Sequence, residues 1–134
     1  MRGRKRAADA MPAPLEAQEQ ATLFEWMAYN TGRYPELNLC YHVPNGGSRN
    51  TVEAHNLKLQ GVKAGVPDIV LPVPRGKYAA LYIELKRKKG SKTSDEQRGW
   101  IDALNRAGNR AVICYGWEAA AAEIMAYLKG VARK

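Results

Sequence analysis

Two acidic residues and a lysine form a pattern typical of metal-dependent chemistry on phosphate esters. Asp68 follows Pro67 at the start of one short apolar run, and Glu84-Leu85-Lys86 stands near the end of the next. Side chains along a strand alternate between two faces, so Glu84 and Lys86 point the same way and Leu85 points oppositely. Two neighbouring carboxylates can hold a hard divalent cation. Lys86 beside that cation would orient or help deprotonate an attacking water and stabilise developing negative charge. The pattern therefore indicates phosphodiester cleavage.

The two acids share one face only if the hairpin between them has the right register. A three-residue loop, Arg75-Gly76-Lys77, places Asp68 directly opposite Glu84. An even loop shifts the pairing by one residue and separates the carboxylates onto opposite faces. The prediction therefore requires an odd loop or a β-bulge. The alternative is an ordinary hairpin with the acids and the lysine on its wet face, and the short P-D…E-x-K pattern alone does not exclude it.

Charge indicates the class of partner. The chain has 134 residues and a formal net charge of +8. Such an excess favours a polyanion, because each phosphate contact releases condensed counterions. Part of the excess lies in residues 1–14, which we expect to form a basic flexible arm, while residues 15–134 are predicted to form one domain. The basic run beside the candidate site is predicted to contact DNA through Arg87, Lys88, Lys89 and Lys92.

Other features of the sequence argue against a secreted, disulfide-bonded or membrane-spanning protein. Cys40 and Cys114 lack metal-ligand spacing, so we interpret them as reduced core thiols in a reducing compartment. We find neither an apolar run near eighteen residues nor a secretion signal after the basic N-terminus. We therefore expect a soluble cytoplasmic protein with no membrane partner.

Apolar periodicity and turn residues predict helices and strands in the order α-β-α-β-β-α-β-α. This order describes an α/β fold in which helices flank a mixed central sheet. Gly61 and Gly65, with Pro67, are expected to shape the chain before Asp68. The predicted helices cover residues 15–30, 50–60, 94–107 and 117–129, and the predicted strands cover 37–43, 69–71, 78–85 and 110–115.

The first predicted helix carries two acids, Glu16 and Glu19, either of which could supply a third carboxylate. Helical periodicity places them on either side of the apolar stripe, so it does not choose between them. The alternative is that both are first-turn acids favoured by the helix macrodipole. On the residues alone, that alternative is the better supported.

Four further polar residues have both a structural and a functional interpretation. Gln97 follows Ser94 at capping-box spacing, yet it also lies on the apolar face of its helix, where an amide needs a polar partner. Asn45 and Arg49 flank a Gly-Gly turn whose backbone N–H groups suit phosphate, so we predict that both contact DNA. His42 is better explained as structural.

Together these segments resemble a stand-alone VRR-NUC domain of the kind found in phages and bacteria. That group belongs to the PD-(D/E)xK nuclease superfamily, which also contains archaeal-type Holliday junction resolvases. The resemblance implies a restriction-endonuclease-like core, spans roughly Leu15 to Leu128, and rests on the order and spacing of several motifs. These motifs are E-A-Q-E-Q-A-T-L-F-E-W, H-V-P-N-G-G-S-R, G-V-K-A-G-V-P-D-I-V-L, L-Y-I-E-L-K, S-D-E-Q-R-G-W and V-I-C-Y-G-W-E-A-A.

The resemblance implies roles for residues at the hairpin. Asp68 and Glu84 would be metal ligands, and the backbone carbonyl of Leu85 would complete the protein's share of the ligands. Lys86 would be the catalytic lysine. Gln97 matches the glutamine that follows the E-x-K strand and approaches the active site.

The resemblance also favours one acid of the first helix. Glu16 is the better match because it stands four residues before Gln20, and Glu19 remains its competitor. Domains of this group are expected to use Mg²⁺ or Mn²⁺ and often act as homodimers, in bacteria or in phage-infected cells. A dimer suits branched DNA, because two active sites can address two symmetric strands.

The sequence therefore predicts a metal-dependent DNA endonuclease, with a Holliday junction or a flap as the candidate substrate. The alternative is a catalytically silent, basic nucleic-acid-binding module on the same scaffold. Intact Asp68 and Glu84 argue against the silent module, because binding alone does not need two acids that repel phosphate.

Overall fold

The computed structural model of the protein describes residues 12–44 and 50–131, with the predicted order of helices and strands plus one short 3-10 helix. None of the helices in these two segments is long and apolar enough to cross a membrane. The elements are α2 (Pro12–Asn30), η1 (Pro35–Leu39), β1 (Tyr41–His42), α3 (Thr51–Leu59), β2 (Ile69–Leu71), β3 (Leu81–Lys86), α4 (Asp95–Arg106), β4 (Arg110–Tyr115) and α5 (Trp117–Leu128).

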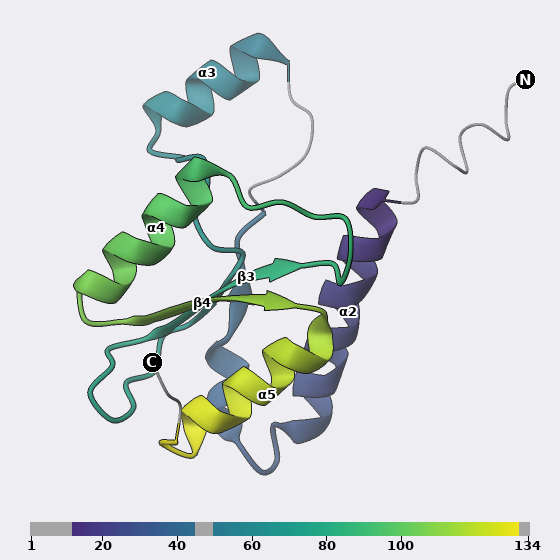
Figure 1. The fold of residues 1–134 in the computed structure, drawn as a ribbon, viewed down its shortest axis with the longest axis vertical. Helices are drawn as coiled ribbons and strands as arrows, with labels where there is room; N and C mark the ends of the chain where they lie inside the picture. Colours follow the sequence, from purple (N-terminus) through teal and green to yellow (C-terminus); the bar gives the residue numbers. More distant parts are fainter. Residues whose placement is uncertain (1–11, 45–49, 132–134) are drawn as a thin grey trace, which may run out of the picture.

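The sheet is mixed, as predicted, with the strand order β1-β2-β3-β4. β1 and β2 pair antiparallel, as do β2 and β3, whereas β3 and β4 run parallel. Parallel neighbours need a crossover, which α4 supplies between β3 and β4. α4 covers one face of the sheet, and α2 and α5 pack together on the other (Figure 1).

Alternation along β3 separates the core from the site. Leu81, Ile83 and Leu85 are almost fully buried in the cluster that includes the inward side chains of α2 and α5. Burying each such side chain stabilises the fold by about 1.5–3 kcal/mol. The residues between them point toward α4, which places Glu84 and Lys86 on the opposite face from this core. The apolar core thus fixes the face on which the charged residues stand.

The register of the β2–β3 hairpin places Asp68 opposite Glu84, as predicted. Ile69 pairs with Ile83, and continuing the pairing by one residue brings the two acids together. The carboxylates therefore stand on the same face of neighbouring strands.

The tip of the hairpin differs from the predicted three-residue loop. Arg75 and Tyr78 exchange backbone hydrogen bonds of 3.0 and 2.9 Å around a two-residue turn. Residues 72–74 on one arm then face only residues 79–80 on the other, so one extra residue restores the register. A β-bulge, and not a three-residue loop, therefore sets the register of the two acids. Pro72 and Pro74 lie in the longer arm, where an interrupted ladder requires no N–H from them.

Three predicted boundaries were wrong, and one of them is the strand predicted over 78–85, which begins only at Leu81. The first three residues of the predicted strand over 37–43 belong to the 3-10 helix η1, because Pro35 suits a first helical turn and the turn itself buries Leu37. Only Tyr41–His42 pairs as a strand. The first helix begins at Pro12 instead of residue 15, so it includes the end of the predicted arm; proline is compatible with a first turn because that turn needs no N–H donors. The remainder of the predicted arm lies outside the described residues.

Candidate active site

Asp68 directly precedes β2 and is fixed through both its side chain and its main chain. Its Oδ2 accepts a 2.9 Å hydrogen bond from the Leu85 N–H. Its carbonyl accepts a 2.7 Å bond from the Val43 N–H and lies 3.0 Å from His42 Nδ1. His42 thus contacts the main chain of Asp68 and helps to place it, in keeping with the structural role expected for it.

Pro67 ends the β2–β3 ladder at the acid. In this register position 67 lies opposite Leu85, and proline has no N–H to donate to the Leu85 carbonyl. The Leu85 N–H binds the Asp68 carboxylate instead. The N–H and C=O of one strand residue point to the same side, so the Leu85 carbonyl is directed toward Asp68. This geometry suits the carbonyl as a third oxygen ligand.

Glu84 is buried, and its two oxygens differ in their surroundings. Oε2 accepts a 2.7 Å hydrogen bond from Gln97 Nε2 and lies 3.6 Å from Lys86 Nζ. Oε1 is buried without a hydrogen-bond partner among the described residues. Burial, reinforced by the charge of Asp68, raises the pKa of Glu84 to about 8. Burial also raises the pKa of Asp68, against the opposing hydrogen bond from Leu85. Such a site favours a positive charge.

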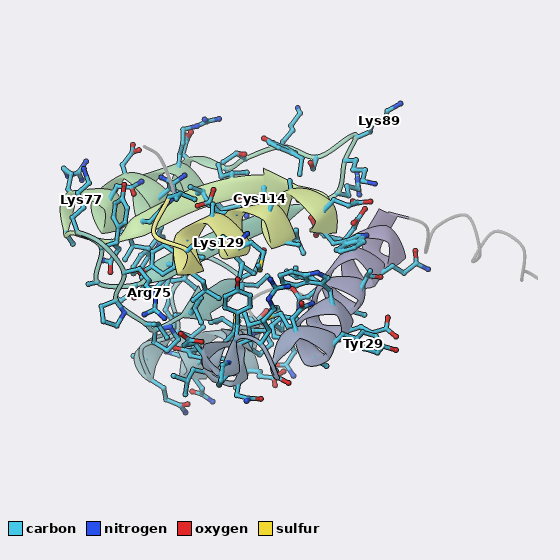
Figure 2. All side chains as sticks on the ribbon, turned by 90° about the horizontal axis from the view of Figure 1, so that it is seen from below. Tyr29, Arg75, Lys77, Lys89, Cys114 and Lys129 are labelled. Carbon is cyan, nitrogen blue, oxygen red and sulfur yellow. The ribbon has the colours of Figure 1, made fainter. Side chains whose placement is uncertain are left out.

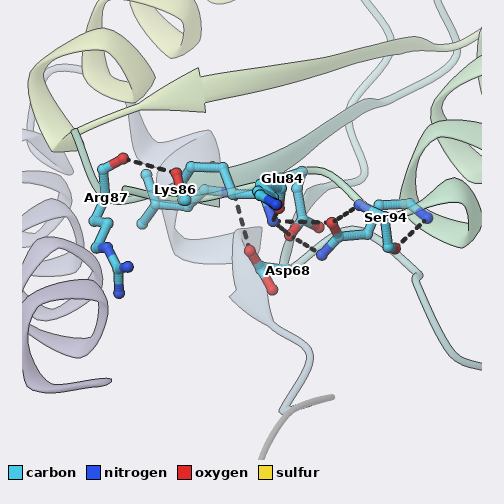
Figure 3. A network of polar contacts seen from close by, with 9 residues as sticks. Asp68, Glu84, Lys86, Arg87 and Ser94 are labelled. Carbon is cyan, nitrogen blue, oxygen red and sulfur yellow. Dashed lines mark hydrogen bonds and ion pairs between the residues drawn. The ribbon is translucent and has the colours of Figure 1, made fainter. Parts of the chain in front are cut away.

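The side chain of Lys86 is held in place beside the two acids. Its Nζ donates to the Lys92 carbonyl at 2.8 Å and to Gln97 Oε1 at 2.9 Å. Glu84 Oε2, at 3.6 Å, faces the third donor. An ammonium has three N–H donors and no acceptor. The lysine therefore presents a fixed positive charge, positioned by groups from β3, α4 and the loop between them (Figure 3).

Gln97 forms the predicted capping box and also contacts two candidate site residues. Its N–H donates to Ser94 Oγ at 3.1 Å, and its Oε1 accepts from the Ser94 N–H at 2.9 Å, which completes the capping box of α4. The same side chain joins Glu84 to Lys86. The first turn of α4 is therefore part of the site (Figure 3).

Gly65 brings the segment before Asp68 against this first turn. A Cβ at position 65 would lie 2.7 Å from the Cβ of Glu96 and 2.9 Å from the Gln97 nitrogen. Its φ of +87° also disfavours any other residue. The glycine thus permits the close approach that forms one wall of the pocket.

The two acids of α2 have different environments. Glu16 lines the pocket, and its charge contributes to the raised pKa values of Asp68 and Glu84. Glu19 instead accepts a 2.8 Å hydrogen bond from the Trp117 N–H, which caps the start of α5. Within the described chain, no three acidic, His or Cys side chains converge closely enough to bind a metal. Glu16 is exposed and lines the pocket, so it lies at the rim.

The pocket encloses about 260 Å³ and includes one acid that sequence reasoning missed, Glu96. Its position in the first turn of α4 gave no functional signal, because acids are common there for electrostatic reasons. A larger cavity of about 410 Å³ lies near Tyr78 and Asn109 and contains none of the candidate catalytic residues. The smaller pocket is lined by Glu16, Ala64, Gly65, Val66, Asp68, Glu84, Lys86, Ser94, Glu96 and Gln97.

Comparison with known proteins decides the family. A sequence profile of the VRR-NUC domain matches residues 14–118. The chain belongs to the VRR-NUC family. A solved structure of a VRR_NUC domain protein has the same fold, with a TM-score of 0.73 and 29% sequence identity over 87% of this chain and 90% of that chain. No curated protein matches the sequence. VRR-NUC is a nuclease-type family, so the membership of this chain supports nuclease activity on a nucleic acid.

The strand residues of this VRR-NUC domain fit a hard divalent cation. Asp68 and Glu84 offer carboxylate oxygens on one face, and the Leu85 carbonyl is directed toward them. Oxygen donors of this kind suit Mg²⁺ and Mn²⁺. The buried Glu84 Oε1, which no described residue contacts by a hydrogen bond, supplies a direct structural reason for a cation here.

The basic residues predicted to contact DNA are not equivalent in this VRR-NUC domain. Arg87 donates to main-chain carbonyls of its own loop. Lys88 pairs with Glu118 of α5 at 3.2 Å. Lys89 projects away from the protein (Figure 2), and Lys92 has an exposed side chain. Asn45 and Arg49 lie outside the described residues.

Proposed function

We propose that this VRR-NUC protein is a DNA endonuclease that hydrolyses phosphodiester bonds with Mg²⁺ or Mn²⁺. The observation that carries the proposal is the buried Glu84 Oε1, which lacks a hydrogen-bond partner in the described segments and shares a face with Asp68. Leaving a charged oxygen buried and unpaired costs folding free energy. A divalent cation would remove that cost and would neutralise the repulsion between the acids and phosphate.

Each residue of the site has a definite part in this chemistry. Asp68, Glu84 and the Leu85 carbonyl would hold the cation, which supplies Lewis acidity toward phosphate and activates water. Lys86 stabilises negative charge developing on the phosphate, because its ammonium is already fixed before substrate arrives. Gln97 keeps Glu84 and Lys86 in one geometry.

Glu16 is proposed to orient water at the rim. It lines the pocket and influences both strand acids electrostatically, yet it does not converge with them as a third ligand. We therefore propose that the Glu16 carboxylate orients water or accepts a proton from it. Glu19 instead caps α5.

We extend the proposal to the substrate and the assembly. The net charge of +8 supports a polyanionic substrate, and DNA branched as a Holliday junction or a flap is the form that we propose. A homodimer would present two active sites to two symmetric strands.

The decisive experiment compares cleavage of linear, flap and four-way junction DNA in Mg²⁺, Mn²⁺ or EDTA. Asp68→Asn and Glu84→Gln are near-isosteric and should abolish metal-dependent cleavage while the fold persists. In EDTA they should bind DNA at least as tightly as wild type, and any gain for Glu84→Gln should appear as the pH rises through about 8, where wild-type Glu84 becomes charged and repels phosphate. Glu25→Gln removes an exposed carboxylate of α2 and is the matched control, which should cleave normally.

The outcomes separate the two functions. Metal-dependent cleavage by the wild type and by the Glu25 control, but by neither site variant, supports the endonuclease. A wild type that binds DNA but cleaves no substrate in either metal supports the silent binding module. Near-normal cleavage by Asp68→Asn or Glu84→Gln would contradict the site.

A further inference from the structure

The loop between β3 and α4 contains a guanidinium directed at its own backbone. Arg87 Nε donates to the Lys89 carbonyl at 2.8 Å, and its Nη2 donates to the Gly90 carbonyl at 2.6 Å. Lys89, two residues away, is exposed and points outward (Figure 2). Two neighbouring basic residues of one loop therefore have different environments, although the sequence suggested phosphate contacts for both.

The loop is closed tightly around Arg87. A Cβ at Gly90 would lie 3.2 Å from Arg87 Nη2, and Gly90 has a φ of +79°. The Arg87 carbonyl also accepts a 3.2 Å hydrogen bond from Ser91 Oγ. Both the side chain and the main chain of Arg87 thus determine the curvature of the loop.

The curved loop leads to Lys92, whose carbonyl contacts the candidate catalytic lysine, Lys86. The Lys92 carbonyl, directly after Ser91, accepts a 2.8 Å hydrogen bond from Lys86 Nζ. Figure 3 shows the hydrogen bond at the Arg87 carbonyl and the contacts of Lys86 with its neighbours. Lys86 is 6% exposed, so an acceptor lost from its ammonium would not be replaced readily by bulk water.

We propose that Arg87 is a positioning residue: it shapes the loop so that the Lys92 carbonyl holds Lys86 in its active orientation. This inference rests on the proposed nuclease function. A phosphate-contacting arginine would chiefly change DNA affinity and its salt dependence. A positioning arginine changes turnover, because a small displacement of a catalytic group slows the chemical step.

The first test compares Arg87→Lys, Arg87→Ala and Lys89→Ala in cleavage and DNA-binding assays. Arg87→Lys keeps the charge but lacks the planar fork that reaches two carbonyls. Both Arg87 variants should lower kcat by roughly tenfold, with KM and the salt slope of binding close to wild type. Lys89→Ala should instead weaken DNA binding, with a salt slope smaller by about one and a higher KM, and the exposed Glu25→Gln control on α2 should change neither kcat nor binding.

The second test does not depend on cleavage. In the metal-free wild type, Lys86 should resist reductive methylation, measured by peptide mass spectrometry, because its ammonium is buried and bonded. Both Arg87 variants should lose that protection, whereas Lys89→Ala should retain it. Circular dichroism establishes that each variant is folded, and Arg87→Lys is the conservative variant that preserves the interpretation should Arg87→Ala unfold.

Each result has one meaning. Lower kcat and loss of Lys86 protection in Arg87→Lys support the positioning role. Normal kcat in Arg87→Lys, or a reduced salt slope with Lys86 still protected in Arg87→Ala, overturns it. A wild type that cleaves no DNA refutes the proposed function alone, and the methylation result then decides whether Arg87 fixes Lys86.

Discussion

Glu84→Gln should stabilise the metal-free protein, and its advantage should grow as the pH rises. Burial and the nearby Asp68 raise the pKa of Glu84 in the folded protein to about 8, against 4.5 for an ordinary glutamate. Between these values the folded protein binds more protons than the unfolded chain. Stability from this group is therefore fully present below pH 4.5 and is lost as the pH rises through 8. The amide introduced by Glu84→Gln carries no charge, so the variant does not lose stability in this way as the pH rises.

The size of the effect follows from the two pKa values. Their difference corresponds to about 5 kcal/mol above pH 8 and about 3 kcal/mol at pH 7. Either figure is a large part of the roughly 5–15 kcal/mol that stabilises a typical domain. Hydrogen bonding of the new amide shifts the whole stability curve by a constant and leaves its dependence on pH unaffected. The slope is therefore the quantity to measure.

Urea unfolding in EDTA, followed by tryptophan fluorescence from pH 5 to 9, provides the measurement. Wild type and the Glu25→Gln control should lose stability relative to Glu84→Gln as the pH rises. Saturating Mg²⁺ should then stabilise wild type much more than Glu84→Gln. Parallel curves for wild type and Glu84→Gln would refute the reasoning, because they would mean that Glu84 titrates as an ordinary exposed acid.

Three further predictions address single features of the site. Lys86→Ala should lower kcat by about 10²-fold or more with little change in the Mg²⁺ requirement, and a loss of only a few-fold would make Lys86 part of the basic surface. Glu16→Ala should raise the Mg²⁺ concentration needed for half-maximal cleavage. Glu19→Ala should leave that concentration unchanged and lower the free energy of unfolding by about 1 kcal/mol. The reverse pattern would transfer the role to Glu19. Gly65→Ala should reduce stability in thermal unfolding, and activity in nuclease assays, far more than Gly61→Ala does. The two glycines both have a positive φ, but only Gly65 contacts the backbone of α4. Equal effects would mean that backbone strain alone matters.

Sequence by itself determined the features that depend on near neighbours. Alternation along β3 placed Glu84 and Lys86 on one face, and the Ser94–Gln97 spacing marked the start of α4. The motifs around Asp68 led to the correct family and the correct order of elements. Periodicity, caps and turns act over a few residues, which is why they can be seen in the chain alone.

Tertiary structure decided the features that depend on distant partners. Glu19 and Trp117 meet although they stand 98 positions apart, and only the packing of α2 against α5 directs Glu19 to the cap and leaves Glu16 in the pocket. The register of the acids likewise depends on an extra residue near the hairpin tip. Arg87 has the same charge as its neighbours, but the curvature of the folded loop directs it at the loop's own backbone. Side-chain partners are chosen by packing across the sheet and between helices, and that packing exists only in the assembled fold.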